Sequence, residues 1–275
     1  MAANPLQQFF RQPKVYIKLP SQGLYNKPGT LQGDATNMPV YGMTGMDEII
    51  LKTPDALLTG ESTVKVVESC CPNIKDAWSM SIIDLNMIFA AIRIATFGNE
   101  MAVVHNCPSC GTENEYDLDL GKIIEHFNKF TYSNKVELSD MVIKTKPLTY
   151  RESTEFNLKN FRLQQRLQQT EQIEDQAEQQ LRINELFQEL SVIQSDLYKA
   201  SVDTVELNNS VVTDATFISE WLSNCDKIVY DSIKNHIEKN RELWKSPNYP
   251  VKCDTCGNET SIFMELDQSN FFGKA

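Results

Sequence analysis

The spacing of apolar and polar residues changes along this chain and predicts different elements in different regions. Residues 14–19 alternate between polar and apolar, as a half-buried strand does, and residues 40–43 form a second short strand. Apolar residues at three- and four-residue steps predict a helix from Ile82 to Phe97. Ser81 suits its N-cap, and Gly98 follows it at the position where helices often end.

Turn residues separate these elements, and residues 26–38 are expected to form a loop or a hairpin tip. These strands and helices together predict an N-terminal α+β region over residues 14–98. A flexible polar arm is expected before it, at residues 1–13. Three shorter helices are expected. The first is Glu48–Leu51, which follows a capping box that begins at Thr44, and the second starts at Thr53-Pro54. The third is Ser62–Cys71.

From Thr149 to about Ala200 the pattern becomes helical and includes a glutamine-rich tract, Gln164 to Gln180. No glycine or proline interrupts this stretch, so one long helix and an antiparallel pair turning near residues 170–175 both fit. We favour the pair, because a lone helix with so few apolar positions in its middle needs a partner. Such a polar arm with a thin apolar stripe favours partner binding over a purely solvated role.

The flanking segments complete a predicted mainly helical insertion over residues 121–250. Residues 120–130 are compatible with a short helix or a loop. The other expected elements are a strand pair at residues 136–144, a β-hairpin at 202–212 about Asn208-Asn209, and helices at 214–222 and 226–244.

Two Cys-x-x-Cys-Gly runs carry the strongest chemical signal of the chain. Each run lets two sulfurs of a tight turn point at one ion, and two such knuckles supply the four thiolates of a tetrahedral structural zinc site. Strands are expected on both sides of the first run, at residues 101–105 and 112–120. The predicted ligands of one structural zinc per chain are Cys107, Cys110, Cys253 and Cys256.

The separation of the two runs is unusual. The residues numbered 111 to 252 lie between them, whereas about 15–20 residues separate the two halves of an ordinary zinc ribbon. We therefore predict a split zinc ribbon with halves at residues 99–120 and 251–275. Two disulfides or two independent thiol pairs are the alternative interpretation.

The remaining candidates for chemistry are weaker. Cys70, Cys71 and Cys225 are interpreted as buried thiols, and His105 is expected to point away from the metal because of its strand parity. The chain has no phosphate-binding glycine loop, no nucleophile elbow and no His-Glu-x-x-His motif. We therefore expect a protein that is not an enzyme.

Charge and hydropathy further narrow the class of protein to which this chain can belong. The formal net charge is −11 and the pI about 4.9, which disfavours direct nucleic-acid binding. No run of 18 apolar residues predicts a membrane span, and the N-terminus does not look like a signal peptide. Seven cysteines without a secretion signal favour a reducing compartment such as the cytoplasm.

Several segments of the chain carry distinctive motifs: Lys18-Leu-Pro-Ser-Gln-Gly-Leu-Tyr25, Val40 to Glu48, Leu51 to Gly60, Cys71, Ala91 to Ala95, and the Cys107 knuckle. These motifs resemble one family, the baseplate hub assembly proteins of T-even-like contractile-tailed phages. The resemblance covers residues 14–120 best and implies a non-enzymatic role in building or forming the baseplate hub, in the host cytoplasm during assembly or in the virion tail. It implies other tail and hub proteins as partners and no catalytic residues. A zinc-ribbon transcription-associated regulator is the alternative, which the negative charge disfavours.

Overall fold

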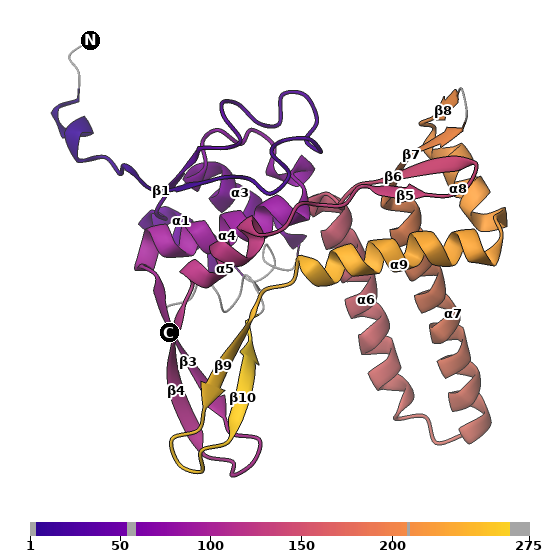
Figure 1. Ribbon diagram of the computed structural model, residues 1–275. Helices are drawn as coiled ribbons and strands as arrows, with labels where there is room; N and C mark the ends of the chain where they lie inside the picture. Colours follow the sequence, from indigo (N-terminus) through magenta and orange to yellow (C-terminus); the bar gives the residue numbers. More distant parts are fainter. Residues whose placement is uncertain (1–3, 54–58, 208–209, 265–275) are drawn as a thin grey trace. The chain divides into compact units, whose positions relative to one another are not determined.

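The computed structural model describes residues 4–53, 59–207 and 210–264 (Figure 1). The chain forms two compact units, one comprising Met1–Thr131 and Trp244–Ala275 and the other Tyr132–Leu243. Helices and strands mix in both units, so the predicted α+β class is confirmed. The predicted helix start at Thr53-Pro54, the turn at Asn208-Asn209 and the chain after residue 264 lie wholly or partly outside the described residues.

The N-terminal part of the first unit is built around one buried helix, α4 (Ile82–Phe97). Its predicted bounds are confirmed, since Ser81 caps it by accepting a hydrogen bond from the backbone N–H of Asp84, and Gly98 follows. Because apolar residues occur all round α4, strands and helices can cover it on several sides. The other elements of this part are η1 (Pro5–Phe9), β1 (Pro13–Ile17), β2 (Met38–Tyr41), α1 (Gly45–Leu51), α3 (Glu61–Cys70) and η2 (Ala77–Ser79).

Strands β1 and β2 pair antiparallel and pack against α4. At the end of β2, a Cβ on Gly42 would lie 2.8 Å from the carbonyl oxygen of Ala95, so only glycine permits this close approach. The predicted capping box at Thr44 is confirmed at the start of α1. The expected loop at residues 26–38 forms no strand before Met38 apart from a single bridge between Leu31 and Ile74.

The last residues of the predicted flexible arm are anchored. Arg11 donates hydrogen bonds to the carbonyl oxygens of Gly42 and Ser69, both at 2.7 Å, and forms an ion pair with Asp47. Before it, Pro5–Phe9 forms a single 3-10 helix. The arm is therefore attached to the α+β body from Arg11 onward.

A buried carboxylate holds the Leu19-Pro20-Ser21 segment in place near the N-terminus. Asp84, fully buried on α4, accepts hydrogen bonds from the backbone N–H of Ser21 at 2.8 Å and from the hydroxyls of Ser21 and Ser81. Burial raises the pKa of Asp84, although the bonds from Ser21 and Ser81 oppose the rise. The carboxylate thus fixes the turn after β1 to the first turn of α4.

Replacing Asp84 with alanine should destabilise the protein by about 3 kcal/mol, because three buried donors lose their acceptor. Asp34→Ala is the matched control, since Asp34 is exposed and its carboxylate accepts its hydrogen bonds from the neighbouring Thr36. Urea unfolding of both variants measures the difference. Equal midpoints for Asp84→Ala and Asp34→Ala would contradict the role assigned to Asp84.

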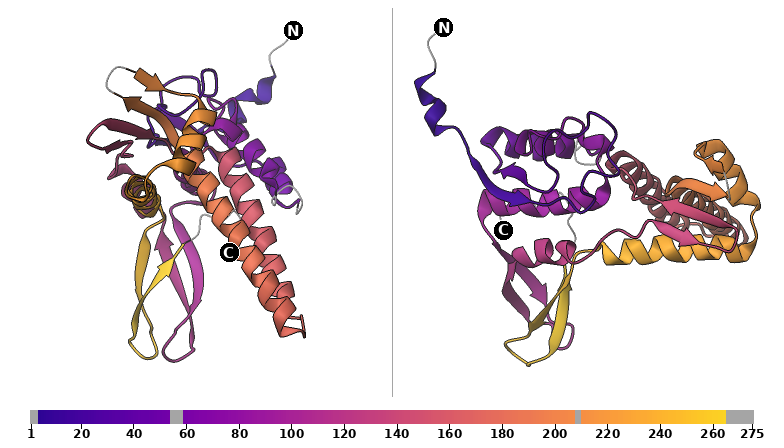
Figure 2. Two further views of the ribbon diagram at one scale, coloured as in Figure 1. Left: turned by 90° about the vertical axis from the view of Figure 1, so that its right-hand side faces the viewer. Right: turned by 45° about the horizontal axis from the view of Figure 1, so that its top comes forward.

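Two β-hairpins and a short helix make up the rest of the first unit, as far as Met264. Strands β3 (Glu100–Asn106) and β4 (Glu113–Asp119) form one antiparallel pair, and β9 (Asn248–Lys252) and β10 (Glu259–Phe263) form the other. Figures 1 and 2 show the two hairpins side by side with their tips at the same end. Helix α5 (Gly121–Asn128) packs on α4, which resolves the choice between helix and loop at residues 120–130.

The second unit combines a four-stranded antiparallel sheet with four helices. The sheet order is β5 (Lys135–Glu137), β6 (Met141–Thr145), β7 (Val202–Leu207) and β8 (Ser210–Val212). The two predicted hairpins are thus confirmed as pairs, but β6 and β7 also join them into one sheet. The helices are α6 (Tyr150–Thr170), α7 (Gln176–Ala200), α8 (Ala215–Asn224) and α9 (Lys227–Leu243).

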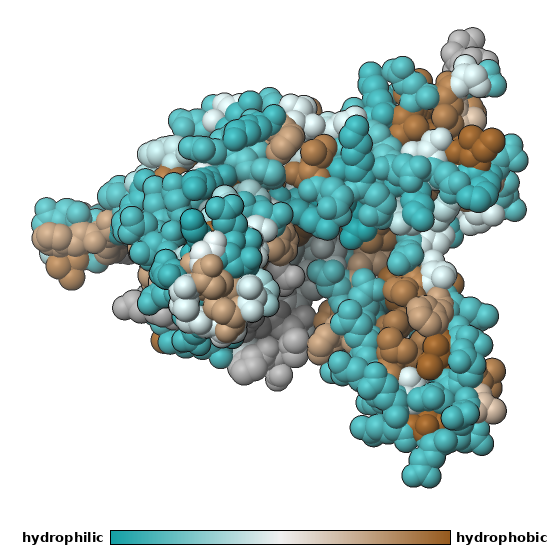
Figure 3. Space-filling model, turned by 60° about the horizontal axis from the view of Figure 1, so that its bottom comes forward, coloured by the Kyte–Doolittle hydropathy of each residue, from teal (hydrophilic) through white to brown (hydrophobic). Residues whose placement is uncertain are grey.

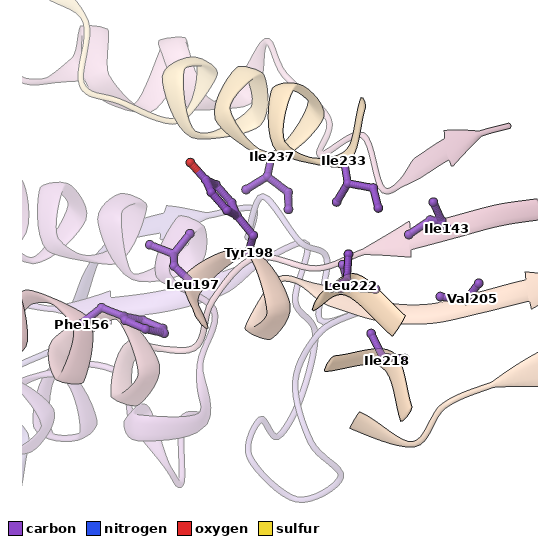
Figure 4. Close-up of a cluster of buried hydrophobic side chains, with 10 residues drawn as sticks. Ile143, Phe156, Leu197, Tyr198, Val205, Ile218, Leu222, Ile233 and Ile237 are labelled. Atoms are coloured by element: carbon purple, nitrogen blue, oxygen red, sulfur yellow. The ribbon is translucent and has the colours of Figure 1, made fainter. Parts of the chain in front are cut away.

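The favoured antiparallel helix pair is confirmed, because α6 ends at Thr170 and α7 begins after the N-cap Asp175 (Figures 1 and 2). One end of this hairpin enters the core of the unit, where side chains of the sheet, α8 and α9 meet it (Figure 4). That core consists of Ile143, Phe156, Leu197, Tyr198, Val202, Val205, Ile218, Leu222, Ile233 and Ile237.

The bounds of the second unit, residues 132–243, are narrower than those of the expected insertion, residues 121–250. Helix α5 belongs to the first unit because Ile123 and Phe127 are fully buried there. Trp244 also belongs to the first unit, where its ring stacks on Phe127 with centroids 5.9 Å apart. Trp244 is therefore a core residue, and Trp221 packs at the edge of the second unit's core.

Candidate metal centre

Four cysteine sulfurs gather at the tips of the two hairpins of the first unit. The sulfurs of Cys107, Cys110, Cys253 and Cys256 all lie within 4.8 Å of one another. Two cross-hairpin distances, Cys107 to Cys256 and Cys110 to Cys253, are each 3.7 Å. In a tetrahedral site with Zn–S bonds of about 2.3 Å, neighbouring sulfurs lie about 3.8 Å apart. The donor set and its spacing therefore fit a zinc ion.

The two knuckles have the same backbone construction. In the first, the N–H of Cys107 donates to the carbonyl of Thr112, and in the second the N–H of Cys253 donates to that of Asn258, each at 2.9 Å. The glycine after the second cysteine has a φ of 72° in both. Glycine adopts this left-handed conformation without steric cost, which suits it to both turns.

Each knuckle contributes one buried and one exposed sulfur. Cys107 and Cys253 are 3% and 2% exposed, whereas Cys110 and Cys256 are exposed. Protein therefore covers the cluster on one side and solvent reaches it on the other. Four sulfurs would fill a tetrahedral shell and leave no position for a substrate, so the arrangement suits a structural ion.

Hydrogen bonds lower the pKa of two of the four cysteines, whereas, against the lowering effect of the backbone N–H of Asn258, contacts with the other sulfurs raise the pKa of Cys256 to about 11. The backbone N–H of Cys256 is the main cause that lowers the pKa of Cys253 to about 6. The hydroxyl and backbone N–H of Thr112 lower the pKa of Cys110. Metals bind thiolates, so these donors favour the state that a metal requires.

Two tyrosines tie the hairpins together outside the cluster. The Tyr249 hydroxyl donates to the carbonyl of Asp119 at 3.0 Å, and the Tyr116 hydroxyl donates to that of Lys252 at 3.2 Å. Sequence analysis missed this role, although Tyr116 was expected on the ribbon strand. It also missed Asn114, whose buried amide lies 3.5 Å from the sulfur of Cys253.

The other cysteines and His105 lie outside the cluster. His105 is not among the residues whose ligand atoms gather there. Cys70 and Cys71 are fully buried at the end of α3, as expected, and burial raises the pKa of Cys70 to about 12. Such thiols stay protonated and pack as apolar groups. Cys225 is half-buried, and burial likewise raises its pKa.

Among the residues that the structure describes, no helix combines the length and the apolar character that a membrane span requires.

Comparison with known proteins places this architecture in a family. No curated protein and no solved structure matches the chain. One family model does, that of the T4 bacteriophage base plate protein, and it matches residues 44–273. The match spans well over half of the chain and includes both knuckles and the whole second unit. The chain therefore belongs to the T4 bacteriophage base plate protein family.

Proposed function

We propose that this protein is a non-enzymatic component, or assembly factor, of the central hub of the phage tail baseplate. Family membership is the observation that carries the proposal, because a baseplate protein works by contacting other phage structural proteins. The resemblance of residues 14–120 to hub assembly proteins supports the hub in particular. The protein would act in the host cytoplasm while tails assemble, with or without remaining in the finished virion.

We further propose that Cys107, Cys110, Cys253 and Cys256 hold one structural zinc. The ion would join the β3–β4 hairpin to the β9–β10 hairpin, which lie far apart along the chain. Its contribution would be to folding, since a structural zinc binds the folded chain and not the unfolded one. The residues around the site would orient the sulfurs and exclude water from one side.

The contact surface proposed for other baseplate proteins is the α6–α7 hairpin. Four large apolar side chains on it, Phe161, Leu181, Phe187 and Val192, are between 46% and 59% exposed. Figure 3 shows apolar residues, in brown, along this hairpin, bordered by polar residues. Exposed apolar groups gathered on one element favour a protein contact.

The hairpin is also rigid enough to present these groups. Leu163 and Leu186 are buried, Arg166 pairs with both carboxylate oxygens of Glu189, and Gln179 donates to the carbonyl of Thr170 at the tip. A preformed surface loses little conformational freedom on binding. The hairpin can therefore be changed on its outer side without changing its packed side.

The test replaces Phe161, Leu181, Phe187 and Val192 together by serine. We expect the variant to fold, because these side chains already face solvent, but to lose at least about tenfold in affinity for its tail partner. The matched control replaces four exposed glutamines of α6, Gln164, Gln165, Gln168 and Gln169, by serine. Pull-down from infected cells and complementation of a phage that lacks this gene measure the two outcomes.

Two results would count against the proposal in different ways. If the serine variant supports normal tail assembly, the contact lies elsewhere on the protein. If the unaltered protein recovers RNA polymerase and no tail proteins, the baseplate function itself is wrong and the transcription-associated alternative is favoured.

A further inference from the structure

Asn114 connects the two knuckles through a single buried side chain. It lies on β4, four residues after Cys110, and is 7% exposed. We propose that Asn114 is a positioning residue that holds the second knuckle against the first and thereby tightens binding of the metal. This inference rests on the proposed zinc site and adds to it the residue that sets how tightly the ion is retained.

The contacts of Asn114 reach both knuckles. Its Nδ2 donates to the carbonyl of Thr112 at 2.9 Å, within the first knuckle. Its Oδ1 accepts the backbone N–H of Asp254 at 3.2 Å, within the second. The sulfur of Cys253 lies 3.5 Å from Nδ2 and 3.6 Å from Oδ1. One amide therefore contacts a ligand sulfur and the backbone residue that follows it.

Metal binding would select one of the two sulfur contacts. A metal-bound thiolate has no proton to donate, so only the N–H of Nδ2 can bond to it. Zn²⁺ with four thiolates carries a net charge of −2, and N–H donors offset the excess negative charge on the sulfurs. Because Cys253 is buried, water is poorly placed to replace this donor.

The second knuckle has no equivalent of Asn114. Thr112 and Asn258 occupy matching positions, since each accepts the backbone N–H of the first cysteine of its knuckle. Two residues after Asn258 stands Thr260, which is half-buried. Within residues 4–53, 59–207 and 210–264, no hydrogen bond joins Thr260 to a cysteine sulfur. The two otherwise similar knuckles therefore differ at this position, which makes Thr260 a matched control.

The experiment compares Asn114→Leu, Asn114→Asp and Thr260→Val in the full chain. Asn114→Leu removes all the polar contacts at similar volume, and Asn114→Asp keeps the acceptor for Asp254 but loses the donors. Zinc affinity is measured by competition with a chromophoric chelator. The thiolate charge-transfer band of the cobalt(II)-substituted protein reports on the sulfurs themselves. We expect both Asn114 variants to bind one zinc at saturation but about 10–100-fold more weakly, with a shifted cobalt band.

The outcomes separate this inference from the proposed zinc site. Thr260→Val should keep the affinity and the cobalt spectrum of the unaltered protein. Wild-type affinity in both Asn114 variants would overturn the inference and leave the zinc site standing. If Asn114→Leu does not fold, Asn114→Asp decides the question alone. If the unaltered protein binds no zinc, the proposed site is wrong and this inference falls with it.

Discussion

Replacing Cys256 with serine is expected to release the metal and lower the free energy of unfolding of the first unit by several kcal/mol. A serine hydroxyl is a poor zinc ligand at neutral pH, and structural zinc binding is part of the folding free energy. The effect should be large because the ion would join segments separated by residues 111 to 252. Loss of that link leaves the β9–β10 hairpin joined to β3–β4 by the two tyrosine bonds and by the bond that the backbone N–H of Asp254 donates to Asn114.

Metal analysis and calorimetry measure this prediction. The unaltered protein should contain close to one zinc per chain, and Cys256→Ser should contain little and melt at lower temperature. Cys225→Ser is the control, because Cys225 is half-buried and lies outside the cluster. An unchanged melting temperature, no zinc in reduced protein, or two disulfides found by mass spectrometry would contradict a joint site.

Replacing Ile92 with aspartate should abolish folding of the first unit. Ile92 is fully buried on α4, the helix that β1, β2 and α5 cover. A carboxylate at this position would have no hydrogen-bond partner and would also leave a packing defect. The expected loss exceeds about 4 kcal/mol, which is a large share of the stability of a typical domain.

The control for this prediction is Ile49→Asp on α1, since Ile49 is 63% exposed. The same chemical change there should alter stability by less than about 0.5 kcal/mol. Circular dichroism follows the whole chain, and tryptophan fluorescence in a Trp221→Phe background follows the first unit, because Trp244 is buried there against Phe127. A soluble Ile92→Asp protein with a cooperative, unshifted transition would contradict the central role given to α4.

Sequence alone predicted the elements whose signals are local. The helix at 82–97 has both of its ends marked, by Ser81 and by Gly98, so its predicted bounds agree with α4. Thr44 and Asp47 mark the start of α1 in the same way, because together they form a capping box. The turn between α6 and α7 was harder to predict from the sequence, because no glycine or proline marks it. Only the need to bury an apolar stripe indicated a pair of helices.

The two knuckles were also predicted from residues that are close together in the sequence. Residue type and two-residue spacing were enough to predict four gathered cysteines. Their meeting across residues 111 to 252 was predicted from chemistry alone, because one tetrahedral ion needs four donors. The supporting contacts of Asn114, Tyr116 and Tyr249 had no such signal, since asparagine and tyrosine are common on strands and loops.

Only the tertiary structure decided which elements share a core. Sequence analysis placed residues 136–144 and 202–212 in separate hairpins, and the pairing of β6 with β7 unites them across α6 and α7. It placed α5 and Trp244 in the insertion, whereas both pack in the first unit. It identified Ser81 as the N-cap of α4, but not the hydrogen bond that the backbone N–H of Ser21 donates to Asp84. Local signals arise from neighbours in the chain, whereas these contacts join residues far apart in sequence, so the packing of the whole chain selects them.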